Sequence, residues 1–174
     1  MGYLKNTIIN QWYNPKPWGN ILWPFARIFA KLVEFRKHCY DKNIFTKYKA
    51  KVPVIIVGNL TVGGTGKTPL VIYLAQFLAA HGYRPGIVSR GYKGQINSVI
   101  LVSPYSDPKV VSDEAVLLAN RSKCPVMVAK KRAVGVRQLV QHNKVNIIIC
   151  DDGLQHYALE RDIEIAVIDR KSVV

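Results

Sequence analysis

Short apolar runs alternate with longer amphipathic segments along most of the chain, from residue 52 onward. The short runs are rich in β-branched residues and predict buried strands at 52–60, 84–90, 98–102, 124–129, 145–150 and 163–169. Apolar residues that recur every three to four positions predict helices at 69–82, 112–121 and 130–143. Strands that alternate with helices favour right-handed crossovers. The pattern therefore predicts an α/β fold with a mostly parallel sheet and helices on both faces.

The segment 21–37 has the pattern of an amphipathic helix. Its apolar side chains fall near one face, and they are Ile21, Leu22, Phe25, Ile28, Phe29, Leu32 and Phe35. Arg27, Lys31 and Glu34 fall on the other face. A bilayer-spanning helix needs about twenty apolar residues, and the longest uninterrupted apolar run here is only 21–26. The segment fits a helix lying in the membrane interface, or alternatively a helix packed on the domain behind it.

The charge of the chain is strongly positive, with 25 Lys and Arg against 11 Asp and Glu. Such an excess favours an anionic partner, which could be nucleic acid, an acidic membrane surface or a phosphorylated substrate. Residues 1–51 hold ten of the basic residues, only two acidic ones and all three tryptophans. We therefore predict a basic, membrane-associating segment at 1–51, an anionic membrane surface as its partner, and no nucleic-acid partner. The remaining residues, 52–174, form the predicted α/β lobe.

The segment 61–68 joins the first predicted strand to the helix at 69–82, and its sequence is that of a phosphate-binding loop. Its residues are Thr61, Val62, Gly63, Gly64, Thr65, Gly66, Lys67 and Thr68. Glycines let backbone N–H groups approach phosphates, and the helix N-terminus offers further amides and a positive dipole end. Lys67 would reach the β- and γ-phosphates of ATP, and the Thr68 hydroxyl would ligate Mg²⁺. Thr61 stands where the GxxxxGK[ST] pattern has glycine, and the alternative is a glycine-rich turn with an incidental lysine.

Two adjacent acids, Asp151 and Asp152, end the apolar strand at 145–150. Ligands of parallel α/β sheets bind at the carboxyl ends of the strands. A carboxylate at this position can hold Mg²⁺ directly or through water, as a Walker-B aspartate does. The alternative is that the two acids form a turn or cap a helix.

Two further groups are candidates for the same edge of the sheet. Asp113 and Glu114 open a helix behind Ser112, where acids complement the helix dipole. Phosphoryl transfer to an alcohol also needs a carboxylate that accepts the hydroxyl proton, and Asp113 is a candidate. Arg90 follows a predicted strand and could pair with a phosphate, or it could be a surface arginine of a capped turn.

These motifs, in this order, resemble one family. VPVIIVGNLTVGGTGKTPLV, VSRGY, SDEAVLLA and DDGLQHYALERDIEIAVID look like the tetraacyldisaccharide 4'-kinases of lipid A synthesis, and WYNPKPWGNILWPFARIF resembles their membrane-associating start. The resemblance extends to about residue 169. It implies a P-loop NTPase-like fold preceded by an amphipathic helix. It also implies transfer of the ATP γ-phosphate to the 4'-hydroxyl of a tetraacylated glucosamine disaccharide-1-phosphate.

The resemblance also implies a location and residue roles. The family works at the cytoplasmic face of the bacterial inner membrane, so we expect a peripheral or monotopic protein. The loop 61–68 would cradle ATP, with Lys67 acting on the transferred phosphate. Asp113 matches the proposed base, and Asp151 and Asp152 match the acidic pair near Mg²⁺. Arg90, Gly91, Tyr92 and Glu114 would lie on the substrate side.

Two departures from the family pattern limit these expectations. Lys93 stands where family members usually have glycine. Family members are also about twice as long and continue into a second α/β lobe, whereas the tail at 170–174 does not resemble that continuation. We therefore expect a truncated form of the kinase. A membrane-recruited P-loop ATPase, an inactive nucleotide-binding remnant and a basic nucleic-acid-binding module remain as alternatives, and the sequence leaves the oligomeric state open.

Overall fold

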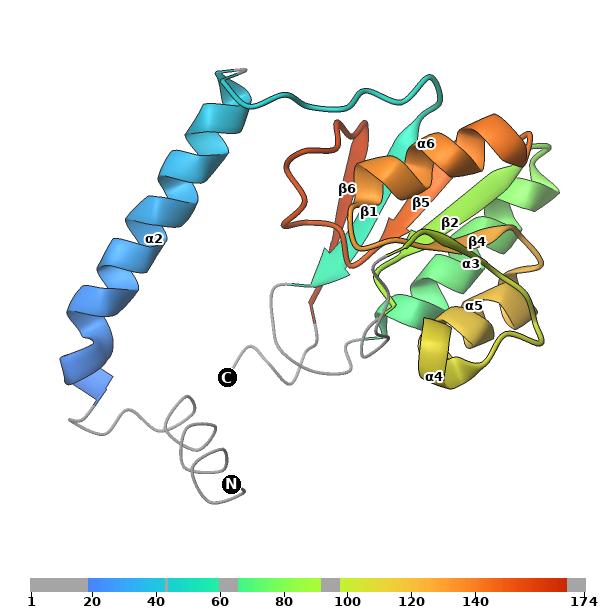
Figure 1. The fold of residues 1–174 in the computed structure, drawn as a ribbon, viewed down its shortest axis with the longest axis horizontal. Coiled ribbons are helices and arrows are strands. Elements are labelled where there is room, and N and C mark those ends of the chain that lie inside the picture. Colours follow the sequence, from blue (N-terminus) through green and yellow to red (C-terminus); the bar gives the residue numbers. More distant parts are fainter. Residues whose placement is uncertain (1–18, 43, 60–65, 92–97, 169–174) are drawn as a thin grey trace. The chain divides into compact units, whose positions relative to one another are not determined.

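A computed structural model of the chain describes residues 19–42, 44–59, 66–91 and 98–168 (Figure 1). The chain divides into two compact units, Met1–Phe45 and Thr46–Val174. The first unit contains the amphipathic helix, and the second contains the α/β lobe. The membrane-associating role that the sequence suggests for the first part of the chain stays a prediction.

The second unit is built on one sheet with the strand order β3-β4-β2-β5-β1-β6 in the described part of the chain. Its strands are β1 (Val54–Asn59), β2 (Pro85–Ser89), β3 (Ile100–Val102), β4 (Val126–Val128), β5 (Ile147–Asp151) and β6 (Ile163–Val167). Neighbouring strands are parallel, except that β3 runs antiparallel to β4. The predicted mostly parallel sheet is therefore confirmed.

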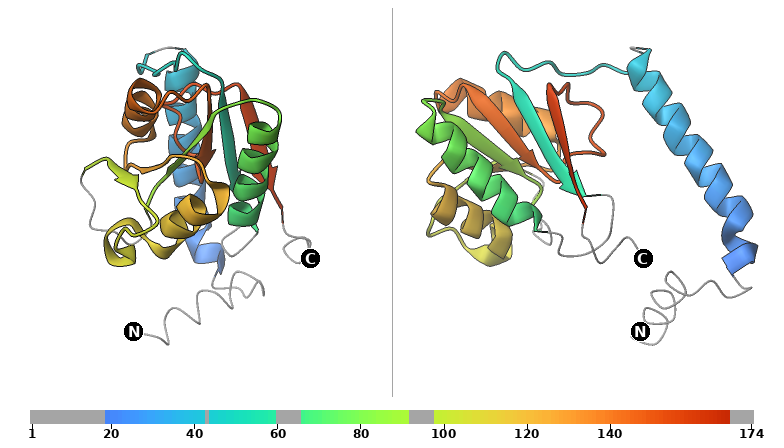
Figure 2. Two further views of the ribbon diagram at one scale, coloured as in Figure 1. Left: turned by 90° about the vertical axis from the view of Figure 1, so that its right-hand side faces the viewer. Right: turned by 180° about the vertical axis from the view of Figure 1, so that it is seen from behind.

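Helices cover both faces of this sheet, as the sequence predicted. They are α3 (Lys67–Ala80), α4 (Pro108–Val111), α5 (Asp113–Ser122) and α6 (Arg132–His142). Figure 2 shows α3 and α6 on opposite sides of the sheet. The short helix α4 was not predicted, because a single turn leaves no hydrophobic periodicity. Its start is nevertheless encoded locally, since the Asp107 carboxylate accepts a hydrogen bond from the Lys109 N–H at 2.9 Å.

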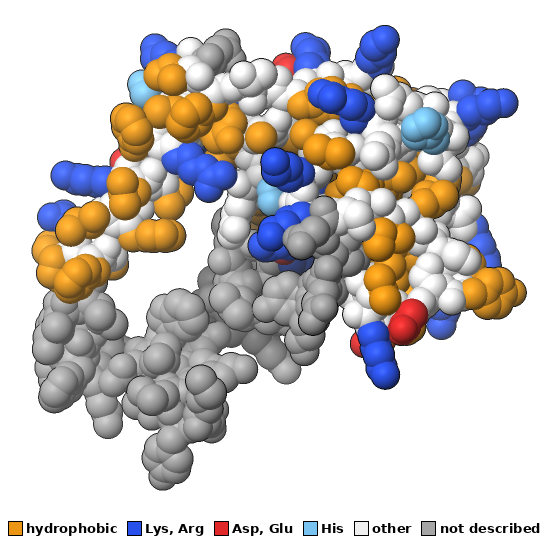
Figure 3. All heavy atoms as spheres, viewed as in Figure 1, with side chains coloured by type: hydrophobic (Ala, Val, Ile, Leu, Met, Phe, Trp, Pro, Cys, Tyr) orange, Lys and Arg blue, Asp and Glu red, His pale blue; other side chains and the backbone are white. Residues whose placement is uncertain are grey.

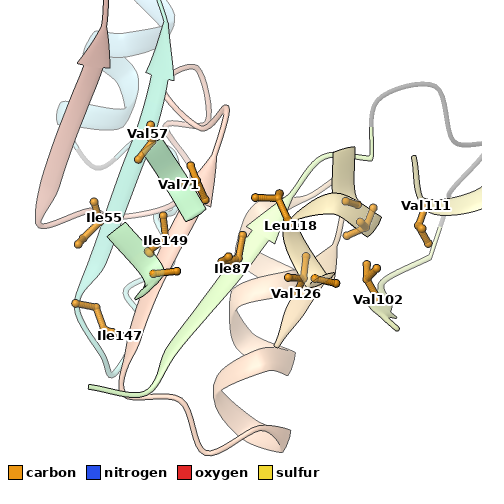
Figure 4. Close-up of a cluster of buried hydrophobic side chains, with 14 residues drawn as sticks. Ile55, Val57, Val71, Ile87, Val102, Val111, Leu118, Val126, Ile147 and Ile149 are labelled. Atoms are coloured by element: carbon orange, nitrogen blue, oxygen red, sulfur yellow. The ribbon is translucent and has the colours of Figure 1, made fainter. Parts of the chain in front are cut away.

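Two hydrophobic cores lie between the helices and the sheet, one on each face of the sheet. On one face, Val71 of α3 and Leu118 of α5 pack with Ile55, Val57 and other buried strand residues (Figure 4). On the other face, α6 packs against the alternate residues of the same strands, among them Val54, Ile56 and Ile148. Because each central strand is buried on both faces, its sequence is continuously apolar rather than alternating.

The strand order brings two of the sequence motifs, the start of α3 and the acids after β5, to the same edge of the sheet. The chain runs from β1 through α3 to β2, but β5 lies between β1 and β2. Val57 of β1 is paired with Asp151 of β5, so the start of α3 and the acids after β5 share one edge of the sheet. This is the edge at which ligands of parallel α/β sheets bind.

The first unit consists mainly of helix α2 (Gly19–Asp41), which confirms the helix predicted at 21–37. Its described hydrophobic side chains from Trp23 to Phe35 are exposed, and Figure 3 shows them among cationic side chains along the helix. The Arg27 guanidinium lies 4.3 Å from the centroid of the Trp23 ring. Among the described residues, no helix has the length and apolar character needed to cross a bilayer.

The packing of α5 predicts a sharp contrast between two neighbouring leucines. Leu118 is fully buried, whereas Leu117 is 44% exposed. We expect Leu118→Ala to lower the free energy of unfolding by about 2–5 kcal/mol, because it leaves a cavity in the core. Leu117→Ala is the matched control and should cost less than about 1 kcal/mol. Urea unfolding of both variants measures the difference, and equal losses would show that α5 does not pack as described.

Candidate functional site

The candidate site lies where the start of α3, the start of α5 and the end of β5 meet. It contains Lys67 and Thr68 from α3, Glu114 from α5, and Asp151 and Asp152 from the end of β5 and the turn after it. The first five residues of the predicted phosphate-binding loop, 61–65, lie outside the described residues. Gly66 precedes α3 with a φ of 77°, a left-handed conformation that glycine adopts without strain.

Lys67 is bound to one of the predicted acids. Its Nζ lies 2.9 Å from Oδ1 of Asp152, although the two residues are 85 positions apart. The Lys67 side chain is 18% exposed and that of Asp152 is 52% exposed. Because Asp152 remains open to water, this ion pair is weak and exchangeable. A phosphate could take the place of the carboxylate at Lys67.

Thr68 is bound to Glu114 rather than to the aspartates. The Thr68 hydroxyl donates a hydrogen bond to Oε1 of Glu114, which lies in the first turn of α5. The sequence assigned Glu114 to the substrate side and Thr68 to the metal, but the structure brings these two residues together. Asp113, the candidate base, is exposed at the first position of α5. The adjacent Ser112 caps that helix, because its hydroxyl accepts from the Ala115 N–H at 3.4 Å.

Asp151 is the most buried acid of the site. It is 2% exposed, and its Oδ1 has no hydrogen-bond partner among the described residues. Burial raises the pKa of Asp151 from 3.8 to about 6, and the negative charge of Glu114 adds to this rise. Lys67 opposes the rise. An unpartnered buried carboxylate is costly, so this position favours binding of a cation.

The side chains fit a magnesium ion bound together with a phosphate. Within the described ranges, no three His, Cys, Asp or Glu side chains form a cluster that could hold a metal by itself. Mg²⁺ commonly keeps several waters and binds through one or two carboxylates plus substrate phosphates, with oxygen as the only ligand type. The carboxylates of Asp151, Asp152 and Glu114 and the hydroxyl of Thr68 supply that chemistry.

The arginine of the SRGY segment lies at the carboxyl end of β2. Arg90 is exposed, and Gly91 is buried with a φ of 67°. Burial is the main cause that lowers the pKa of Arg132, and the positive charge of Arg90 contributes to this lowering. Arg90 is therefore close enough to the site to influence it electrostatically. Tyr92 lies outside the described residues.

Sequence reasoning missed Arg132, the first residue of α6. It is only 1% exposed, and its guanidinium binds the backbone carbonyl oxygens of Ala129, Asp151 and Asp152. No short motif marks this residue. Its one sequence signal is its position, since it opens a helix directly after a buried strand and must therefore lie at the ligand-binding edge.

Comparisons with known proteins show the family to which the chain is similar. Residues 18–174 match the family model described as Tetraacyldisaccharide-1-P 4'-kinase, LpxK. The tetraacyldisaccharide 4'-kinase of Nitrosococcus oceani is 48% identical over 170 residues, which are 97% of the chain and 50% of that relative. The enzyme of Tolumonas auensis is 51% identical over 160 residues, 91% of the chain and 49% of the relative. The chain thus spans about half the length of the curated relatives it matches.

A solved structure is also similar. It is LpxK from Aquifex aeolicus in complex with ATP, which matches with a TM-score of 0.79 and 36% identity. The match covers 88% of the chain and 50% of that protein. The similarity in structure therefore includes most of the described α/β lobe.

The raised pKa of Asp151 predicts a pH-dependent stability without metal or nucleotide. Because the folded-state pKa, about 6, lies above the ordinary 3.8, the folded protein binds the proton more tightly than the unfolded chain. Stability should fall as the pH rises from 4 to 7. Asp151→Asn cannot ionise, so it should gain about 2–3 kcal/mol relative to wild type over that range. Urea unfolding at several pH values measures this, and parallel curves for the two proteins would contradict it.

Proposed function

Because the chain belongs to the tetraacyldisaccharide 4'-kinase family, we propose that it forms the nucleotide-binding part of an ATP-dependent lipid kinase. The acceptor is the 4'-hydroxyl of a tetraacylated glucosamine disaccharide-1-phosphate, a precursor of lipid A. The observations that carry the proposal are the ion pair of Lys67 with Asp152, directly after β5, and the hydrogen bond of Thr68 to Glu114 of α5. The similarity to a kinase structure that contains ATP supports the choice of nucleotide.

The nucleotide would bind at the start of α3. The amides of 61–68 would surround the phosphates, and the unpaired N–H groups of the first helical turn would face them. Lys67 would exchange its Asp152 carboxylate for the β- and γ-phosphates. This exchange costs little because the existing ion pair is partly exposed to water.

Four side chains would hold Mg²⁺ and its waters, namely Thr68, Glu114, Asp151 and Asp152. A Mg²⁺ ion held there would supply positive charge that offsets the negative charge developing on the phosphates. The hydrogen bond between Glu114 and Thr68 favours a role for Glu114 in binding the metal rather than the substrate. The unpartnered Oδ1 makes Asp151 the stronger candidate of the two aspartates for direct ligation.

Asp113 would act on the acceptor. It lies next to Glu114 on the first turn of α5, and it is exposed where a substrate hydroxyl could reach it. A carboxylate at this position orients the hydroxyl and accepts its proton during phosphoryl transfer. Arg90, with Gly91 and Tyr92, would bind the substrate on the same edge, since a guanidinium pairs well with phosphate.

The location of the substrate would require the enzyme at the membrane surface. We propose that α2 lies in the interface at the cytoplasmic face of the inner membrane, with its hydrophobic side chains in the lipid and its cations near acidic headgroups. The hydrophobic row from Trp23 to Phe35, with Arg27 and Lys31 on the same helix, supports this role, because interfacial helices combine an apolar face with basic residues.

The P-loop lysine gives the direct test of the kinase. We expect Lys67→Ala to weaken binding of Mg-ATP to this chain, because the variant loses the cation next to the phosphates. In a fusion that joins the chain to the remaining half of a relative, it should lower formation of 4'-phosphorylated disaccharide by at least about 100-fold. The control is Lys51→Ala, an exposed lysine before β1 at the opposite end of that strand.

The outcomes separate the alternatives. ATP hydrolysis without phosphorylated lipid would indicate an ATPase, and nucleotide binding by the chain without transfer in the fusion would indicate an inactive remnant. Unchanged transfer by the Lys67→Ala fusion would remove the lysine from the mechanism.

Membrane association can be tested on the same chain. We expect it to bind vesicles that contain phosphatidylglycerol and to be released by salt. Phe25→Glu with Phe29→Glu should weaken binding by at least about 10-fold, because two apolar side chains that would be buried in the lipid are lost. Tyr105→Glu changes an exposed aromatic residue of the other unit and is the matched control. Cosedimentation measures the bound fraction, and equal binding by both variants would contradict the role of α2.

A further inference from the structure

The buried guanidinium of Arg132 binds only backbone oxygens in the described part of the chain. Its Nη1 donates to the Ala129 carbonyl at 2.8 Å, and its Nη2 donates to the carbonyls of Asp151 at 2.9 Å and Asp152 at 3.3 Å. Two aspartates are therefore held through their main chain. Neither carboxylate is used by these hydrogen bonds, and Oδ1 of Asp151 has no partner among the described residues.

These hydrogen bonds connect strands that are not neighbours. Ala129 follows β4 and Asp151 ends β5, while β2 lies between the two strands. The Ala129 N–H also donates to the Ser89 carbonyl at the end of β2, at 3.0 Å. The planar guanidinium has five donors that point in several directions, so it can bind carbonyls at the ends of both strands at once, whereas the point-like ammonium of lysine is poorly suited to this.

The start of α6 is packed closely enough to the sheet to place the guanidinium there. At Gly135, an added Cβ would lie 2.7 Å from the Ala129 Cβ and 3.0 Å from Cγ1 of Val88. Only glycine fits at this contact. The first turn of α6 therefore lies directly on the ends of β4 and β2, and Arg132 extends from it to the turn after β5.

Stability alone does not explain this arginine. Burial of a cation is costly, and a purely structural arginine would be expected to pair with the carboxylate beside it. Arg132 instead leaves its own Nε and the Asp151 Oδ1 without partners among the described residues. Replacement of buried charges by apolar residues of similar volume is often neutral or stabilising. The arrangement leaves the acid available at a cost in stability.

We propose that Arg132 is a positioning residue for the Mg²⁺-binding edge. It fixes the main chain of Asp151 and Asp152, and so the direction in which both carboxylates leave the end of β5. Asp152 has a left-handed φ of 54°, a conformation that its bound carbonyl helps to retain. The assignment rests on the proposed function, because it concerns the same metal and nucleotide.

The test compares nucleotide binding with and without Mg²⁺. A fluorescent ATP analogue is titrated into wild type, Arg132→Lys and Arg132→Met, first in EDTA and then with increasing Mg²⁺. We expect affinity in EDTA to stay within about twofold, because the phosphate-binding amides remain, while the Mg²⁺ midpoint rises about 10- to 100-fold. Arg137→Lys is the control, since Arg137 lies on the same helix with its guanidinium 4.8 Å from the Tyr48 ring centroid.

Other results of this titration would overturn the assignment. Folded variants with the wild-type Mg²⁺ midpoint would overturn the assignment, as would equal losses of affinity in EDTA and in Mg²⁺. If both variants fail to fold, Arg132→Ala is measured in guanidinium chloride against the same concentration of potassium chloride. A restored Mg²⁺ response in guanidinium supports the assignment, and no restoration overturns it. Absence of nucleotide binding by wild type would overturn the proposed function itself, and this assignment with it.

Discussion

Burial of one carboxylate next to other acids, at one edge of the sheet, is the constraint on which the arrangement of the site depends. Asp151 is buried beside Asp152, and the charge of Glu114 adds to the rise in the pKa of Asp151. Water cannot screen the charge of the buried Asp151 as it would on an open surface. Lys67 relieves part of the repulsion, since it is paired with Asp152 and opposes the rise in the Asp151 pKa. The remaining deficit of positive charge is what a bound divalent cation would supply.

The polar side chains of the site bind one another in much the same way as they would bind the proposed phosphate and metal. Asp152 gives Lys67 an anionic partner, as a phosphate would, and Thr68 binds a carboxylate of the proposed metal set. These contacts keep the side chains in place before any ligand arrives, so less conformational freedom is lost on binding. They also compete with the ligand. The proposed affinity for Mg-nucleotide would therefore be the difference between two similar sets of charge-assisted contacts.

The sequence was sufficient for the strands and for the residues that belong to a local motif. Runs such as 145–150 are apolar because both faces of the sheet are covered, and Lys67 and Thr68 have fixed spacing from the glycines. The contact of Glu114 with Thr68 could not be predicted, because it depends on the packing of α5 with α3 on one face of the sheet. Arg132 could not be predicted for a similar reason. Its guanidinium binds main-chain carbonyls after β4 and at the end of β5. Every residue has such a carbonyl, so the sequence does not mark these partners.

The two cations of the site show why the same charge needs two different side chains. Lys67 is partly exposed and paired with another side chain, so it can leave Asp152 for a phosphate without breaking the fold. Arg132 is buried and bound to carbonyls, which cannot move away, so it stays in place whatever binds above it. A flexible ammonium suits the first position and a planar, multiply donating guanidinium suits the second. The proposed exchange of ligands at this edge would therefore use one movable cation, Lys67, and one fixed cation, Arg132.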